Sequence, residues 1–227
     1  MNADGEDVMV QAGGDGWAAG DIAAAAAAGA DVGASDGGGC NCVWNAARYG
    51  HAESMAALLA VGGDVNKCHN DGRSAIYVAA RTGHPDCLTQ LISAGGDVNK
   101  CNSNGVSPIY VATEKGHADC LTQLISSGGD VNKCNNDGVS PIDTAPEKGH
   151  ADCLMQLISS GGDVNKCRND GVSPIFIAAC NGHADCLTQL ISSGGDPRSS
   201  WNGTSALDKA RSKGHAECVR VLEAALQ

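Results

Sequence analysis

Aromatic side chains are scarce in this chain of 227 residues: Phe, Trp and Tyr together make up 3% of it, with a single Phe. Ala, Leu, Ile, Val and Cys must therefore fill the core, since 42% of the residues are hydrophobic. Small side chains pack well only where backbones approach closely. This scarcity disfavours a sandwich or barrel and favours short helices stacked in register.

Basic residues are absent from residues 1–36, which carry seven acids. The formal net charge is -11, and the remaining 19 acids and 15 bases leave the body only mildly acidic, at -4. Phosphate groups require a basic face. We therefore expect neither nucleic acid nor an anionic membrane as a partner.

A signal sequence and a long apolar run are also missing. The N-terminus opens with acids, and the run from Ala23 to Ala28 is too short to span a bilayer. These features predict a cytoplasmic or nuclear protein. The twelve cysteines would suggest disulfides only in a short secreted chain, so we expect them to be reduced.

An internal repeat organises the rest of the sequence. Gly-His recurs at intervals of 33, 33, 33, 33 and 32 residues, starting at Gly50, Gly83, Gly116, Gly149, Gly182 and Gly214. Residues 103–135 and 136–168 are identical at 26 of 33 positions. A fixed period of this length predicts a solenoid of stacked units.

Each unit contains signals for two helices and a tight reversal. In the third unit, Ser107 is suited to an N-cap and Pro108 to the first helical position, while Gly116 ends the first helix. A second helix then carries Cys120, Leu121, Leu124 and Ile125 on one face. Gly128-Gly129 ends it, and Asp137-Gly138 predicts a hairpin before the next Ser-Pro.

The period and the succession Asp-Gly, Ser-Pro-Ile, Ala, Gly-His, Leu-Ile, Gly-Gly-Asp-Val-Asn closely resemble the ankyrin repeat. The resemblance covers roughly residues 37–227 and implies an all-α ankyrin-repeat solenoid, whose helix-turn-helix units are joined by β-hairpin loops. The expected units are residues 37–69, 70–102, 103–135, 136–168, 169–201 and 202–227. The family's Thr-Pro-Leu-His becomes Ser-Ala-Ile or Ser-Pro-Ile followed by Tyr77, Tyr110, Asp143 or Phe176, which puts the hydrogen bond of the family's His in doubt.

Residues 1–36 are expected to form an acidic N-terminal tail whose first 15 or so residues are disordered. Within it, Ala27 to Val32 aligns with Ala60 to Val65. A shortened, degenerate helical cap is therefore expected before the first full unit.

Sites for chemistry are considered and rejected. Equivalent residues of neighbouring units lie about 10 Å apart, too far for the repeated His to share a zinc ion or for the repeated Cys to form disulfides. Cys40 and Cys42 form half of a metal motif, and Gly14 to Ala19 matches a phosphate loop without its sheet context. We expect no enzyme activity, no catalytic residue, no metal and no cofactor.

The resemblance implies a concave binding surface of first helices and hairpins, and therefore a monomeric scaffold or adaptor that binds another protein. Departures from the repeat mark candidate contacts, since a specific site should not recur in every unit; Cys180 and Pro146 also depart from it. The candidate residues are Trp44, Arg73, Tyr77, Tyr110, Asp143, Phe176 and Trp201. The aromatic residues serve either as half-buried packing or as anchors. A structural spacer or self-associating rod is the alternative role.

The resemblance also implies a modification. Ankyrin arrays are substrates of an asparaginyl hydroxylase that favours Asn after Asp-Val with Leu eight residues upstream. The matching residues are Asn66, Asn99, Asn132 and Asn165. The alternative is that these side chains only hold the hairpins.

Overall fold

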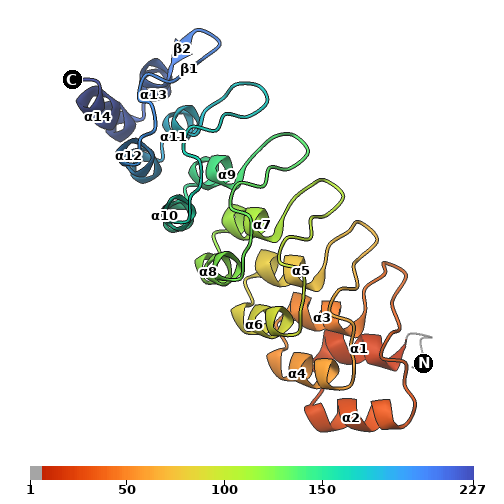
Figure 1. Cartoon of the computed structure of the whole chain (residues 1–227). Coiled ribbons are helices and arrows are strands. Elements are labelled where there is room, and N and C mark those ends of the chain that lie inside the picture. The colour runs from red at the N-terminus through yellow and green to blue at the C-terminus, as the bar shows by residue number, and fades with distance from the viewer. Residues whose placement is uncertain (1–6) are drawn as a thin grey trace.

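The computed structural model describes residues 7–227, which form a single stack of helix pairs (Figure 1). The first helices of the pairs are α1 (Val8–Asp15), α3 (Cys42–Tyr49), α5 (Ala75–Thr82), α7 (Pro108–Lys115), α9 (Pro141–Lys148), α11 (Pro174–Asn181) and α13 (Ala206–Lys213). The second helices are α2 (Ala19–Ala27), α4 (Ala52–Ala60), α6 (Pro85–Ser93), α8 (Ala118–Ser126), α10 (Ala151–Ser159), α12 (Ala184–Ser192) and α14 (Ala216–Ala225). The predicted all-α solenoid is confirmed.

Capping residues fix the ends of the first helices as the sequence predicts. In α7 the Ser107 hydroxyl accepts a hydrogen bond from the amide of Tyr110, and Pro108 occupies the first turn. Gly116 ends the helix in the left-handed conformation, with φ of 74°, which costs glycine little. The serine N-cap and the left-handed glycine recur with Ser74, Ser140, Ser173 and Ser205, and Pro follows the serine in α9 and α11.

The loops between units are tight reversals with little sheet. One strand pair is formed, by β1 (Ser200–Trp201) and β2 (Thr204–Ser205). Elsewhere short backbone bonds close the reversals, as where the amide of Asn102 donates to the Val106 carbonyl over 3.1 Å, and two loops form isolated β-bridges. Neighbouring loops are joined as well, since the amide of Ser103 donates to the Asp71 carbonyl over 2.8 Å.

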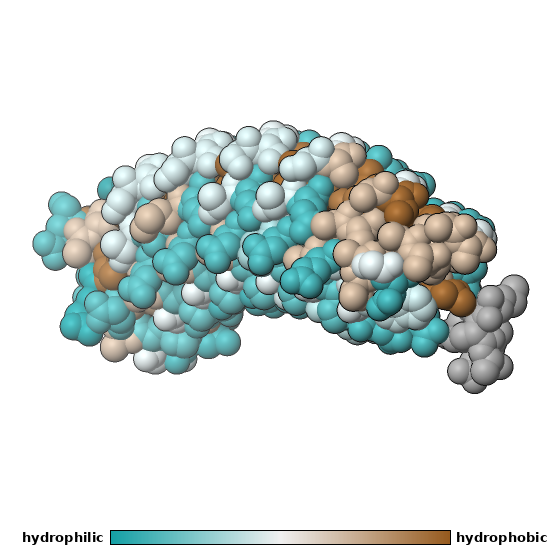
Figure 2. Space-filling view, turned by 90° about the horizontal axis from the view of Figure 1, so that it is seen from below, coloured by the Kyte–Doolittle hydropathy of each residue, from teal (hydrophilic) through white to brown (hydrophobic). Residues whose placement is uncertain are grey.

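The core runs without a break along the stack, from Met9 to Leu222. In the second helices α6, α8, α10 and α12 one Cys and two Leu are buried, as Cys120, Leu121 and Leu124 are in α8. First helices pack more closely on one another than second helices do. The stack therefore curves toward its first helices, and Figure 2 shows the resulting arch, hollowed on one side.

The N-terminal segment departs from its prediction. Residues 8–15, expected to be disordered, form α1, in which Met9 and Ala12 are fully buried, while residues 1–6 lie outside the described part. Together α1 and α2 form a full helix pair packed on α3 and α4, so the expected shortened cap is a complete pair. Figure 2 shows hydrophobic residues gathered toward this end of the arch.

A glycine explains why α1 can pack so closely. A Cβ atom at Gly13 would overlap with the carbonyl group of Cys42 in α3. Only a residue without a side chain permits this approach. The close contact between the first two first helices thus depends on Gly13.

Pro146 lies inside α9 without breaking it. A capping box strengthens the start of this helix, because the Asp143 carboxylate also accepts a bond from the Ser140 amide over 2.9 Å. No helix within residues 7–227 has the length and apolar character required to cross a membrane.

Candidate functional site

The concave side of the arch is formed by first helices and the loops that precede them. The first helices of successive units differ in sequence, from AIYVAART in α5 to PIDTAPEK in α9. The second helices α8 and α12 have the identical sequence ADCLTQLIS, and α10 departs from it only at Met155. Among the central units, from α5 to α12, sequence variation is therefore concentrated on the concave side.

The aromatic residues proposed as an anchor row lie mainly in the core. Trp44, Tyr77 and Phe176 are 3%, 6% and 3% exposed. Tyr110 is half-buried, and burial raises the pKa of its hydroxyl. Packing thus accounts for three of these rings, and Tyr110 is the member of the row that keeps a surface for contact.

Trp201 packs across two units at the C-terminal end. Its indole nitrogen donates to the Asp170 carbonyl over 3.1 Å, and its ring lies 5.9 Å from that of Phe176. It remains half-buried. The residue therefore holds the last loop in place while one part of its ring faces solvent.

Asp143 takes the place of the aromatic ring found in four other units and is completely buried. One carboxylate oxygen accepts bonds from the Ser140 amide and hydroxyl, and the other has no hydrogen-bond partner in the described structure. Arg168 approaches to 3.9 Å and pairs with Glu147 at 2.5 Å. Burial raises the pKa of Asp143, although the Ser140 bonds and the Arg168 charge oppose this. Asp143 supports its helix from within and has no exposed surface in this structure.

A cleft of about 220 Å³ opens on the concave side of the first full units. We call it the arginine cleft; its lining includes Asp36, Trp44, Arg48, His69, Arg73 and Arg81. Arg48 and Trp44 come from α3, Arg81 from α5, and His69 and Arg73 from the loop between the pairs. The cleft thus combines residues of neighbouring units.

Aromatic and acidic neighbours hold the side chains of the cleft. The Trp44 indole nitrogen donates to the Arg73 carbonyl over 3.0 Å, and its ring stacks on His69 at 5.8 Å. Arg48 lies over the rings of Trp44 and Tyr49, at 5.8 and 5.3 Å. Cation–π contacts of this kind restrain a guanidinium without removing its charge.

Asp71 organises the loop beside the arginine cleft. Its carboxylate contacts His69 Nδ1 at 2.7 Å and Arg73 Nε at 2.6 Å. Burial alone would raise the pKa of Asp71. The hydrogen bonds from the Arg73 amide and from His69, together with the Arg73 charge, outweigh burial and lower that pKa. Asp71 is therefore ionised at neutral pH and fixes Arg73.

The asparagines proposed for hydroxylation join neighbouring units. Asn132 accepts from the amide of Asp163 over 3.0 Å and donates to the Gly161 carbonyl over 3.0 Å. Asn99 and Asn165 each make the equivalent pair of bonds with the unit that follows. Asn66 accepts a bond from Asp97 over 3.3 Å. The structural role is therefore present, and modification stays a prediction.

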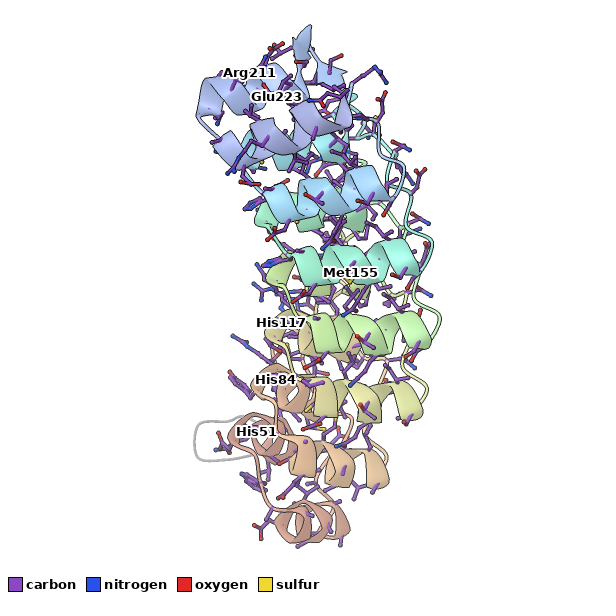
Figure 3. The ribbon with its side chains drawn as sticks, turned by 90° about the vertical axis from the view of Figure 1, so that its left-hand side faces the viewer. His51, His84, His117, Met155, Arg211 and Glu223 are labelled. Atoms are coloured by element: carbon purple, nitrogen blue, oxygen red, sulfur yellow. The ribbon has the colours of Figure 1, made fainter. Side chains whose placement is uncertain are left out.

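Histidines and cysteines occupy structural positions. His51, His84 and His117 lie along one edge of the stack (Figure 3), and each ring packs on the helix-ending glycine of the preceding unit. Cys87, Cys120, Cys153 and Cys186 are buried, and burial raises the pKa of each thiol to about 11. Within residues 7–227 no group of three or more His, Cys, Asp or Glu side chains is placed to hold a metal ion.

The two remaining motifs have structural explanations. Cys40 and Cys42 are buried, and the pKa of each thiol is raised to about 11, chiefly by burial. Gly14 and Asp15 belong to α1, and Gly16 is its left-handed C-cap. The segment from Gly14 to Ala19 therefore joins two helices and lacks the preceding strand that a phosphate loop requires.

Arg48 and Arg81 were missed among the candidate residues. They occupy equivalent positions one repeat apart, so neither departs from its neighbour. The change that could have revealed them comes at the equivalent position of the third and fourth units, which carry Glu114 and Glu147. Comparison across all units at one position would have found the change of charge.

A family model for ankyrin repeats, three copies long, matches residues 18–100, 79–166 and 144–225. No match is found among curated proteins. The crystal structure of the human ASB11 ankyrin repeat domain resembles the chain with a TM-score of 0.75 at 23% identity, over 81% of this chain and 82% of that chain. At that identity the likeness concerns the fold alone. From the family match and the stacked helix pairs together, the chain belongs to the ankyrin-repeat family.

Proposed function

We propose that the chain is a non-catalytic interaction module that binds another protein on its concave side. Ankyrin repeats are in general protein–protein interaction modules, and their fold is typically non-catalytic. The observation that carries the proposal is the uneven variation between units, since α8 and α12 are identical while α5, α7, α9 and α11 all differ.

Recognition explains this distribution. A partner protein does not repeat every 33 residues, so the surface that recognises it must vary from unit to unit. The second helices only need to pack on one another, and one sequence can serve in each. Arg73, Tyr110 and Trp201 retain exposed surface on the concave side, and we propose them as contacts together with Arg48 and Arg81.

Affinity capture with paired variants tests this function. The full chain is used as bait in a cell lysate, beside the concave variant Arg81→Ala/Glu114→Ala and the back variant Thr122→Ala/Thr188→Ala. All four side chains lie outside the buried core, so both variants should fold. We expect quantitative mass spectrometry to show a partner that is depleted with the concave variant and retained with the back variant.

The same samples distinguish the alternative role. A spacer or self-associating rod would capture mainly its own copies and would sediment as an oligomer. Equal retention of every captured protein by the two variants would contradict binding on the concave side.

A further inference from the structure

We propose that the arginine cleft binds the carboxylates of an extended acidic segment of the partner. This inference rests on the proposed function and specifies the chemistry of one part of the concave side. The juxtaposition of Arg48, Arg73 and Arg81 in one cleft of about 220 Å³ carries it.

Two of the three guanidinium groups are free to bind an anion. Within residues 7–227 neither Arg48 nor Arg81 forms an ion pair, whereas Arg73, Arg168, Arg211 and Arg220 do so. Both side chains are exposed. Guanidinium matches a carboxylate with two parallel hydrogen bonds. The cleft therefore presents unused donors suited to carboxylates.

The acids near the cleft are already engaged. Asp71 binds Arg73 and His69, as described above. Asp36 accepts bonds from the amides of Gly38 and Cys40, over 2.8 and 2.9 Å. Three arginines thus face two carboxylates, which leaves a local positive excess on a chain of net charge -11.

The next two units show that this arrangement is specific to the start of the stack. Glu114 and Glu147 take the places of Arg48 and Arg81, and each is paired, with Lys115 at 3.6 Å and Lys148 at 2.9 Å. An acidic segment that lay opposite the third and fourth units instead would meet no excess of positive charge. The change of sign fixes the position of an acidic segment along the groove.

The repeat geometry predicts the spacing of the acids. Arg48 and Arg81 are equivalent residues in adjacent units, whose helices pack about 10 Å apart. A chain in the polyproline II conformation rises about 3.1 Å per residue with three residues per turn, so side chains three residues apart lie on the same side. Two carboxylates three residues apart, as in Glu-Xaa-Xaa-Glu, therefore match the two arginines.

Peptide titration tests the proposal with the full chain at low salt. The probes are fluorescent decapeptides that contain Glu-Xaa-Xaa-Glu, the same residues as adjacent Glu-Glu, or Gln-Xaa-Xaa-Gln. We expect anisotropy to show the tightest binding for the first, and loss of each ion pair to weaken it by about tenfold. The variants are Arg48→Gln and Arg81→Ala, with Lys115→Ala and Lys148→Ala as matched controls on the same face.

Each outcome decides the question. Weaker peptide binding by Arg81→Ala, with the affinity of the two lysine variants unchanged, supports binding in the cleft. Arg81 has no ion pair to lose, so this variant remains informative if Arg48→Gln disturbs the contact with Trp44. Equal affinity for the acidic and neutral peptides would overturn the proposal. Capture through other concave residues would still stand in that case, so failure here is distinct from failure of the proposed function.

Discussion

At the residue scale, Asp143 places a carboxyl group in the core, where four other units have an aromatic ring. Since burial raises its pKa, folded Asp143 keeps its proton over a pH range in which the unfolded chain has released it. The free energy of unfolding then falls as pH rises through this range. The hydrogen bonds from Ser140 and the nearby Arg168 stabilise the carboxyl group in its buried position.

Asp143→Asn tests this argument, because the amide caps the helix without titrating. We expect the variant to gain stability relative to the native chain as pH rises from about 4 to about 7. Denaturant unfolding followed by circular dichroism at several pH values measures the difference. A difference that stays constant, or that shifts in favour of the native chain, would show that Asp143 is not held in its protonated form.

The cysteines provide a second prediction at this scale. Core thiols such as Cys120 and Cys153, with pKa values raised to about 11 by burial, should not react in the folded protein. Cys167 is exposed and should be alkylated first. Mass spectrometry under native conditions should find label mainly on the loop cysteines, and denaturing, non-reducing conditions should yield close to all twelve. A denatured count near zero would mean that the cysteines are bridged.

At the scale of the element, α1 depends on its contact with α3. Gly13→Ala introduces a Cβ atom that overlaps with the Cys42 carbonyl, whereas the nearest atom to a Cβ at Gly14 lies 3.9 Å away. Both substitutions favour helix by about 1 kcal/mol, so Gly14→Ala is a matched control. We expect hydrogen exchange across residues 8–27 to accelerate in the first variant only. Equal exchange in the two variants would show that the close approach is not required.

The helix α9 is the second element with a built-in weakness. Pro146 has no amide to donate to the Ile142 carbonyl, and an interior proline costs a helix about 3 kcal/mol. Hydrogen exchange should therefore be faster in residues 142–148 than in residues 109–115 of α7. Pro146→Ala, which introduces the Ala found at the equivalent position in α5 and α11, should remove the difference. Equal protection in the native chain would contradict this view of α9 as the weakest joint.

The sequence predicts elements well where a local residue determines them. Ser107 and Gly116 mark the ends of α7 because a cap and a left-handed turn are local requirements. The pair α1 and α2 was missed because its signals depend on tertiary contacts: Gly13 is unfavourable within an isolated helix and is explained only by α3. The arginine cleft was missed for a similar reason, since its members are 25 and 33 residues from Arg48 along the chain.

At the scale of the whole molecule, the asparagines determine how firmly the units are joined. Asn132 and Asn165 flank the helix pair α9 and α10, which contains Pro146, and a hydroxylase must draw its target into an extended conformation. After treatment of the array with an asparaginyl hydroxylase, we expect mass spectrometry to find oxygen addition first at these two residues. Addition at Asn66 alone would contradict the reasoning from local opening, and no addition at any of the four would eliminate the modification.

The central claim is that a partner binds the concave side of the whole arch. Site-specific photo-crosslinking tests it most directly, with the photoreactive residue placed at position 115 in α7 or at position 122 in α8. Lys115 and Thr122 are both exposed, so the two probes are equally accessible but face different sides of the stack. We expect a crosslinked partner from position 115 and none from position 122; crosslinks of equal yield from both, or only from position 122, would contradict the account.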